Sequence, residues 1–251
     1  MSRLAQKLSA EVPARGVFLF TGSPDNAEIL GGAGFDAVII DHEHTPGSIE
    51  TAVHQMRAIR AAGDATILVR LAGLDADRIK LTLDCGADGL LLPNAQSAEA
   101  VAALVAACRH PPRGVRGAHF TVSRAARWGA AGDGYLRDFE RGLMLAAMIE
   151  SERGVREIPR MACVDGLSMF FLGPLDLSGS IGRMGAWSDP AVAAVVAEAE
   201  DAALASGVAL AGALVPGDTA ERAFGRGYCF VTLGSDVGML RSAASQALRE
   251  T

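Results

Sequence analysis

Residues 37–44 read Ala-Val-Ile-Ile-Asp-His-Glu-His, a continuous apolar run that ends abruptly in acids and histidines. Continuous rather than alternating apolar residues are typical of a parallel strand that is buried on both faces. Short apolar runs of this kind recur with helical segments between them, at residues 17–20, 37–40, 66–69, 89–92, 143–149, 167–172, 208–214 and 228–233. This pattern predicts an α/β fold, a single (β/α)8 TIM barrel domain over residues 1–251.

The segments between the runs have the features of helices. Ser48 can cap a helix whose apolar residues, from Ile49 to Ile59, share one stripe. Gly63 can end this helix in a left-handed conformation. No linker or low-complexity stretch divides the chain into two domains.

Residues 110–134 are the irregular exception, rich in Gly, Arg and Pro and too long for an ordinary connection. They predict a functional loop or an added helical excursion. The segment contains Arg113, Arg116, Arg124 and Arg127. These arginines form either a solvated basic surface or a lid or subunit contact that recognises an anionic acceptor.

The composition excludes several classes of partner. The 251 residues are half apolar and include 23 basic against 29 acidic side chains, for a net charge of −6. This acidic balance argues against nucleic acid or an anionic membrane as the main partner. No apolar run could cross a membrane, and residues 1–12 lack the apolar segment of a signal peptide. Four widely spaced cysteines without zinc spacing predict small core residues in a reducing compartment, so we expect a cytoplasmic protein.

Polar residues follow the apolar runs where a barrel places its active site, at the carboxyl ends of the strands. The second run is followed by residues 41–44, the third by Arg70, the fifth by Glu150 and the sixth by Asp176. Acids, histidines and an arginine are therefore expected to meet at one mouth.

Glu150 and Asp176 come from adjacent strands, and two such carboxylates can hold a hard divalent cation that keeps several waters. Each acid could instead cap a helix or pair with an arginine. A zinc site on His42 and His44 is disfavoured, because neighbouring residues of a tight turn cannot all face one ion. His44 suits a general base. Arg70 suits a carboxylate or enolate oxygen.

A series of short motifs occurs in order between about residues 17 and 235: Asp41-x-Glu43-His44, Arg70 closing a strand, Leu83-Asp84-x-Gly86-Ala87, the SRAARWG sequence at 123–129, Ile149-Glu150-Ser151 and Gly173-Pro174-x-Asp176-Leu177-Ser178. Together they resemble the metal-dependent (class II) pyruvate aldolases of the hydroxy-oxo-heptanedioate aldolase type. Relatives of this type include rhamnonate-pathway aldolases and macrophomate synthase.

The resemblance implies reversible aldol cleavage of 4-hydroxy-2-oxo acids to pyruvate and an aldehyde through a metal-stabilised pyruvate enolate. It implies Mg²⁺, Mn²⁺ or Co²⁺ on Glu150 and Asp176, with Asp176 also beside the substrate. Arg70 would bind the substrate and stabilise the enolate. His44 would be the base, assisted by Asp84.

The same resemblance places further residues around the substrate. Met148 and Leu175 would touch it, and Asp41 and Glu43 would support the residues that do. Two of these positions depart from the family pattern. Met148 stands where a glutamine is frequent, and Leu175 stands where a smaller residue is frequent, which affects the choice of substrate.

Asp84 raises a geometric difficulty. It lies at the end of the third helix, just before Gly86, and this position is at the opposite end of its own barrel from His44. We therefore expect the two residues to meet across a subunit interface in a homo-oligomer, with Asp41 as the alternative partner of His44.

The sequence argues against an aldolase mechanism that forms a Schiff base with a lysine at the mouth of the barrel. Of the 23 basic side chains only Lys7 and Lys80 are lysines, one before the first strand and one within a helix. A Schiff-base aldolase needs a lysine inside the mouth. The alternatives that stay open are a barrel lyase for acyl-CoA thioesters, an oxaloacetate decarboxylase, and an inactive barrel that binds a 2-oxo acid.

Overall fold

Eight parallel strands close into a barrel in sequence order, β1 through β8. The structure is a computed structural model and describes residues 1–249. The strands are β1 (Ala14–Leu19), β2 (Ala37–Asp41), β3 (Thr66–Arg70), β4 (Gly89–Leu92), β5 (Met144–Ile149), β6 (Met169–Leu172), β7 (Ala209–Ala213) and β8 (Tyr228–Ser235). Each contains most of one predicted apolar run, so the prediction of a (β/α)8 barrel is confirmed.

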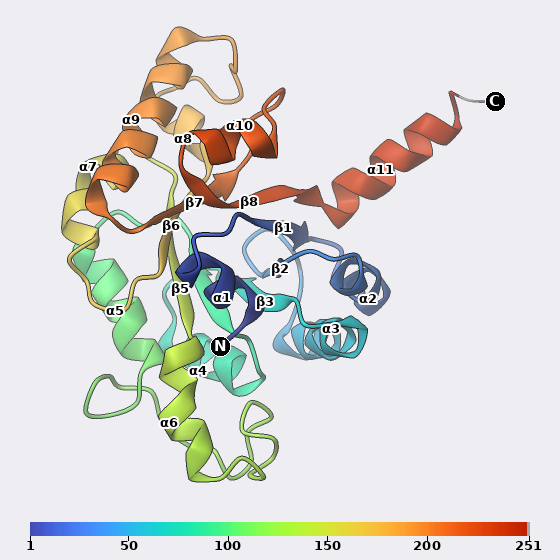
Figure 1. Cartoon of the computed structure of the whole chain (residues 1–251), viewed down its shortest axis with the longest axis vertical. Coiled ribbons are helices and arrows are strands. Elements are labelled where there is room, and N and C mark those ends of the chain that lie inside the picture. The colour runs from blue at the N-terminus through green and yellow to red at the C-terminus, as the bar shows by residue number, and fades with distance from the viewer. Residues whose placement is uncertain (250–251) are drawn as a thin grey trace.

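Helices surround the barrel (Figure 1). The described residues form α1 (Arg3–Ser9), α2 (Pro24–Gly32), α3 (Ile49–Ala62), α4 (Ala76–Asp84), α5 (Ala98–Cys108), α6 (Asp133–Gly142), α7 (Glu152–Met161), α8 (Pro174–Ser180), α9 (Pro190–Ser206), α10 (Ala220–Gly225) and α11 (Asp236–Ala247). Most begin with a side-chain cap; Ser48, for example, accepts from the backbone N–H of Thr51 at 3.2 Å. Gly63 follows α3 with φ 176°, which is extended rather than left-handed, so that detail of the prediction was wrong.

Two apolar clusters hold the barrel. The inner cluster fills the barrel with alternate strand residues such as Phe18, Ile39, Leu68, Phe171 and Phe230. The outer cluster joins the other faces of the strands to the helices. Burial of each large side chain contributes about 2 kcal/mol, so this core fixes the strand ends that carry the site.

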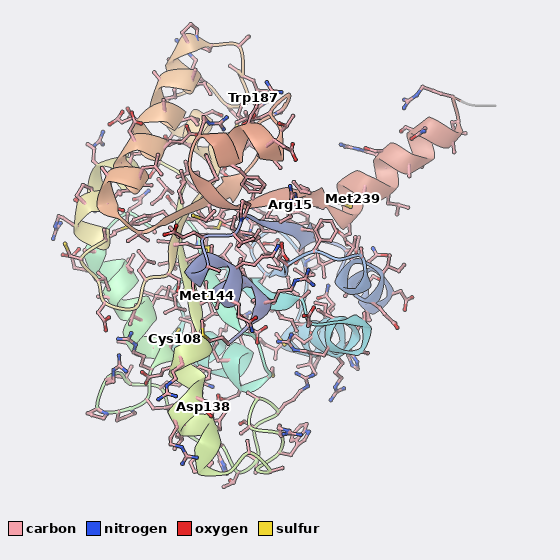
Figure 2. The ribbon with its side chains drawn as sticks, viewed as in Figure 1. Arg15, Cys108, Asp138, Met144, Trp187 and Met239 are labelled. Carbon is pink, nitrogen blue, oxygen red and sulfur yellow. The ribbon has the colours of Figure 1, made fainter. Side chains whose placement is uncertain are left out.

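The helix α1 closes the amino-terminal end of the barrel. Leu4 and Ala5 belong to the inner cluster, and the backbone N–H of Leu4 donates to Thr66 Oγ1 at 2.8 Å. At the other end of the chain, α11 points away from the barrel (Figure 1). Met239, labelled in Figure 2, packs at its base, whereas residues 240–249 are exposed.

The irregular segment at 110–134 consists mainly of turns and leads into α6. It wraps around the end of α4, where the fully buried Arg116 side chain pairs with Asp84 and donates to the Tyr135 hydroxyl at 3.0 Å. Arg116 is therefore not part of a solvated basic surface.

Two other expectations concern the cysteines and membranes. Cys108 alone of the four cysteines is buried and Cys163 is exposed, so the prediction that all four are core residues was wrong. Within residues 1–249, no helix combines the length and apolar character needed to cross a membrane.

Candidate active site

Arg70 is tightly held at the carboxyl end of the barrel. It ends β3 beside Asp41, which ends β2 in register with it. Its Nε donates to Asp41 Oδ1, and its Nη1 lies 2.8 Å from Glu43 Oε2. Its guanidinium also lies over the rings of Phe18 and Phe20, with centroids 5.2 and 5.8 Å away. Two acids and two aromatic faces therefore leave this cation little freedom to move.

Asp41 also shapes the turn that follows β2. Its Oδ2 accepts the backbone N–H of His44 at 2.8 Å, and its Oδ1 accepts that of Glu43 at 3.3 Å. The turn leaves the His44 ring 61% exposed, with Nε2 3.5 Å from Glu43 Oε2. The acid nearest the ring in the same chain is therefore Glu43, while Asp41 contacts the backbone of His44.

Glu150 follows β5 and is almost completely buried. Its Oε2 accepts the backbone N–H of Asn94 at 2.6 Å. The pKa of Glu150 is raised to about 7, chiefly by burial and also by the neighbouring charges of Glu43 and Asp176, against the lowering effects of the Asn94 hydrogen bond and of Arg70. Asp176 lies in the first turn of α8.

Glu150 packs tightly against the backbone that leads into α8. A Cβ atom on Gly173 would lie 2.6 Å from Glu150 Oε1, so this close approach requires glycine. The glycine thus sets the position of the buried carboxylate.

The predicted residues Glu43, His44, Glu150 and Asp176 line one cavity of about 330 Å³. Asn94, Gln96, Ser151 and Ser180 complete its lining. Burial also raises the pKa of Glu43, partly offset by Arg70 and His44. Three acids, Glu43, Glu150 and Asp176, line the cavity, and one arginine, Arg70, lies beside it. The local charge is therefore negative and favours binding of a cation.

The pair of carboxylates fits a divalent ion with open coordination positions. Over residues 1–249, no group of three or more His, Cys, Asp or Glu residues could by itself enclose a metal. Two carboxylates, such as those of Glu150 and Asp176, could supply two oxygen ligands and leave room for water and substrate, as Mg²⁺ commonly requires.

Five predicted site residues lie outside the lining of this cavity. Arg70 and Asp41 adjoin it, because Arg70 contacts both Asp41 and the lining residue Glu43. Asp84 ends α4 near the amino-terminal end of the barrel, where it pairs with Arg116, and no contact joins it to His44 of the same chain within the described residues. Met148 is buried in the inner cluster. Leu175 is 51% exposed on α8 and does not line the cavity.

Sequence reasoning missed the polar wall that Asn94 and Gln96 form after β4. Gln96 Nε2 donates to Asn94 Oδ1 at 2.8 Å and to Ser151 Oγ at 3.1 Å. A signal for it exists in the sequence, because Asn94 stands two residues after the predicted strand at 89–92, where a barrel places its site residues.

Neither lysine lies at this cavity. Lys7 pairs with Asp36 at 2.9 Å on the amino-terminal side, and Lys80 pairs with Asp77 at 2.8 Å on α4.

The fold and its acidic mouth place the protein among the barrel enzymes that act at the carboxyl ends of their strands. Residues 15–243 match the model of the HpcH/HpaI aldolase/citrate lyase family, and the chain belongs to this family. The family resemblance seen in the sequence motifs is thereby confirmed.

Individual relatives cover nearly the whole chain. A hydroxypyruvate/pyruvate aldolase from Chromohalobacter salexigens is 38% identical over 88% of this chain and 87% of its own. A 4-hydroxy-2-oxo-heptane-1,7-dioate aldolase from Escherichia coli is 35% identical over 94% of this chain and 90% of its own. The crystal structure of a HpcH/HpaI aldolase/citrate lyase family protein from Burkholderia cenocepacia has a TM-score of 0.92 at 34% identity, covering 100% of this chain and 99% of the other.

Proposed function

We propose that the protein is a class II pyruvate aldolase that reversibly cleaves 4-hydroxy-2-oxo acids to pyruvate and an aldehyde. The observation that carries this proposal is the meeting of Glu150, Asp176 and His44 at one cavity, with Arg70 held beside them through Glu43. The aldolase names of relatives with 35 to 38% identity support the same reaction class.

Glu150 and Asp176 would hold the divalent ion, which is Mg²⁺, Mn²⁺ or Co²⁺ in this proposal. When bound, the ion supplies positive charge beside the carboxylate and ketone oxygens of a 2-oxo acid. The raised pKa of Glu150 fits such a site, because burial and neighbouring acids disfavour its negative charge in the absence of a cation.

Arg70 would stabilise negative charge that develops on the ketone oxygen. Its contacts with Asp41 and Glu43 use Nε and Nη1, which leaves Nη2 as a donor for substrate. A donor that is already oriented stabilises charge as it forms without reorganising.

His44 would take the proton from the methyl carbon of pyruvate. The exposed ring can meet a substrate, and Glu43 lies 3.5 Å from its Nε2. We assign Asp84 of a second subunit as the partner that raises its basicity, because Asp84 of the same chain lies at the other end of the barrel. The active form is then a homo-oligomer with sites near subunit interfaces, and we expect it in the cytoplasm.

The test is hydrogen exchange at the pyruvate methyl group, followed by NMR in D2O. We expect exchange with Mg²⁺ or Mn²⁺ present, its loss with EDTA and in Glu150→Gln, and recovery of the wild type when metal is returned. Mn²⁺ titration by calorimetry would show whether Glu150→Gln has lost the ion. Wild-type protein that binds metal yet exchanges no methyl protons would contradict the proposal.

Product analysis separates the other reactions on this fold. We expect pyruvate and an aldehyde from a 4-hydroxy-2-oxo acid. Cleavage of an acyl-CoA thioester, or decarboxylation of oxaloacetate, without aldol activity would assign a different function to the same residues.

A further inference from the structure

The cavity at the acidic mouth has a part that the proposed proton transfer and metal binding do not use. Among the described residues, all eight that line its volume of about 330 Å³ are polar, whereas small-molecule pockets are ordinarily lined mostly by apolar side chains. Four of the eight carry the proposed chemistry. The other four are neutral hydrogen-bonding residues, Asn94, Gln96, Ser151 and Ser180. Since the ion and Arg70 would hold pyruvate, these neutral residues are left to contact the aldehyde.

The side-chain amide of Gln96 has a fixed orientation. Its Nε2 donates to Asn94 Oδ1 at 2.8 Å and to Ser151 Oγ at 3.1 Å. An amide nitrogen carries two hydrogens, so these two bonds use both of them and leave Oε1 as an acceptor. Gln96 therefore offers a substrate an acceptor and no donor.

Two donors adjoin that acceptor. Ser151 Oγ accepts the backbone N–H of Gly154 at 3.2 Å as well as the bond from Gln96, which leaves its own hydrogen for a ligand. Asn94 uses its Oδ1 with Gln96, which leaves its Nδ2. A hydroxyl group both donates and accepts, so it can bond to Gln96 Oε1 and to one of these donors together. A carboxylate only accepts, and its oxygens would be repelled by Gln96 Oε1 and by the acids of the mouth.

The backbone that carries the polar wall is held by β5, Glu150 and α7. The N–H of Asn94 donates to Glu150 Oε2 at 2.6 Å, and that of Ala95 donates to the carbonyl oxygen of Met148 at 2.9 Å. A Cβ atom on Gly154, in α7, would lie 2.8 Å from the Ala95 carbonyl oxygen, so glycine allows this contact. Groups on a fixed backbone lose little freedom on binding, so they can distinguish one substituent of a substrate from another.

We propose that Gln96, supported by Asn94 and Ser151, hydrogen-bonds a hydroxyl group of the aldehyde and so makes the enzyme favour hydroxyaldehydes. This inference rests on the proposed aldolase function and names the class of aldehyde that the site takes. In the direction of cleavage, the substrate is then a 4-hydroxy-2-oxo acid with a further hydroxyl beyond C4. An aldehyde that lacks the hydroxyl would cover Gln96 Oε1 and leave this acceptor without a partner, which is unfavourable.

The test compares aldehydes that differ by one hydroxyl: propanal, 3-hydroxypropanal and lactaldehyde as both enantiomers. Each is added to pyruvate by the Mg²⁺-loaded protein. Gln96→Met keeps the length of the side chain and removes the acceptor. We expect the ratio of kcat/KM for the better hydroxyaldehyde to that for propanal to fall about tenfold in this variant. The intrinsic reactivity of the aldehydes cancels when ratios from two proteins are compared. Gln246→Met, on the exposed part of α11, is the matched control and should keep the ratio of the wild type.

A second variant tests the support of Gln96. Asn94 has a φ of 44°, so Asn94→Gly suits the backbone and keeps the N–H bond to Glu150 while it removes one partner of the Gln96 amide. The same ratio should fall. A ratio equal to that of the wild type in both Gln96→Met and Asn94→Gly would overturn the proposal.

Methyl exchange of pyruvate in D2O needs no aldehyde, so it tests the aldolase function separately. Exchange by the wild type, together with unchanged ratios in the variants, would overturn hydroxyl recognition alone. Absence of exchange in the metal-loaded wild type would overturn the aldolase function and this inference with it.

Discussion

Arg70 combines its charge with contacts that a lysine could not reproduce. One guanidinium reaches Asp41 and Glu43 at once and lies over two phenyl rings. A lysine presents a single point charge on a flexible stem. The individual side chain, rather than net charge alone, therefore sets how well the mouth stabilises an oxyanion.

Arg70→Lys should lower kcat/KM for aldol cleavage by about 10²- to 10³-fold, because the substituted amine loses the planar, oriented donors. Steady-state kinetics with saturating metal checks this. Arg153→Lys on the surface is the control. Unchanged kcat/KM in Arg70→Lys would show that Arg70 does not touch the reacting oxygen.

Asp236, at the start of α11, is hydrogen-bonded to the loop that joins β1 to α2. Its carboxylate accepts the backbone N–H groups of Phe20, at 2.9 Å, and Thr21, at 3.2 Å, together with a side-chain bond from Asn26 at 3.3 Å. Burial raises the pKa of this carboxyl, but the hydrogen bonds from Phe20, Thr21 and Asn26 outweigh it and lower the pKa overall.

A lowered pKa in the folded state means that Asp236 stabilises the protein above the unfolded pKa near 4, and that this contribution is lost as the pH falls through the folded value. Asp236→Asn should therefore reduce the free energy of unfolding at pH 7 by about 1.5 to 3 kcal/mol. Urea denaturation at pH 7 and at pH 3 measures the free energy of unfolding of the wild type and of Asp236→Asn. The difference should shrink at pH 3; a constant difference would show that the charge of Asp236 is irrelevant.

At the scale of elements, the sequence predicted the strands better than the connections between them. Buried parallel strands are continuous apolar runs, and this local pattern located all eight. The helix cap at Ser48 could also be predicted, because it depends only on neighbouring residues in the sequence. The polar wall at Asn94 and the burial of Arg116 against Asp84 depend on where the irregular segment folds back, which residues distant in sequence decide. The roles of His44, Arg70, Glu150 and Asp176 stay predictions.

The junction between β6 and α8 offers a test of how elements position the acids. Gly173→Ala would place a methyl group 2.6 Å from Glu150 Oε1 and 2.7 Å from its Cγ, so the whole buried side chain must shift. We expect weaker Mn²⁺ binding by calorimetry together with a lower melting temperature. Gly225→Ala, with open space around its Cβ, is the control. Unaltered Mn²⁺ affinity would argue that Glu150 is not a ligand.

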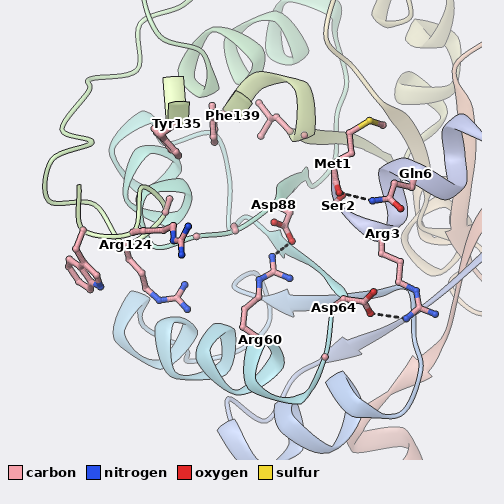
Figure 3. Close-up of a pocket in the computed structure, with 18 residues that line it drawn as sticks. Met1, Ser2, Arg3, Gln6, Arg60, Asp64, Asp88, Arg124, Tyr135 and Phe139 are labelled. Atoms are coloured by element: carbon pink, nitrogen blue, oxygen red, sulfur yellow. Dashed lines mark hydrogen bonds and ion pairs between the residues drawn. The ribbon is translucent and has the colours of Figure 1, made fainter. Parts of the chain in front are cut away.

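At the scale of the whole molecule, the two ends of the barrel have opposite character. Acids gather at the carboxyl end of the strands. Four arginines, Arg3, Arg60, Arg124 and Arg127, line the amino-terminal end with two acids, Asp64 and Asp88 (Figure 3), and Asp84 lies close by. Opposite charges on opposite ends favour contact between the end of one copy and the other end of a second. This polarity is consistent with a base and its acid partner coming from different subunits.

Mixed oligomers test that arrangement. His44→Ala and Asp84→Asn should each be nearly inactive, and Asn keeps an oxygen for Arg116 so that the fold survives. After unfolding and refolding together, the two variants should recover activity at sites that pair His44 of one subunit with Asp84 of another. Refolding either variant alone is the control. No recovery in mixtures shown by mass spectrometry to contain both chains would contradict a shared site.

The scarcity of lysine has a practical consequence for chemical labelling. Lys7 is tied to Asp36 with its side chain 28% exposed, and Lys80 stands on α4 at 38% exposure. Reagents that acylate side-chain amines can therefore react at two lysines, Lys7 on α1 and Lys80 on α4. A short amine-to-amine bridge between two chains would report directly which of these helices face each other in an assembly, once the products of the amino-terminal α-amine are set apart.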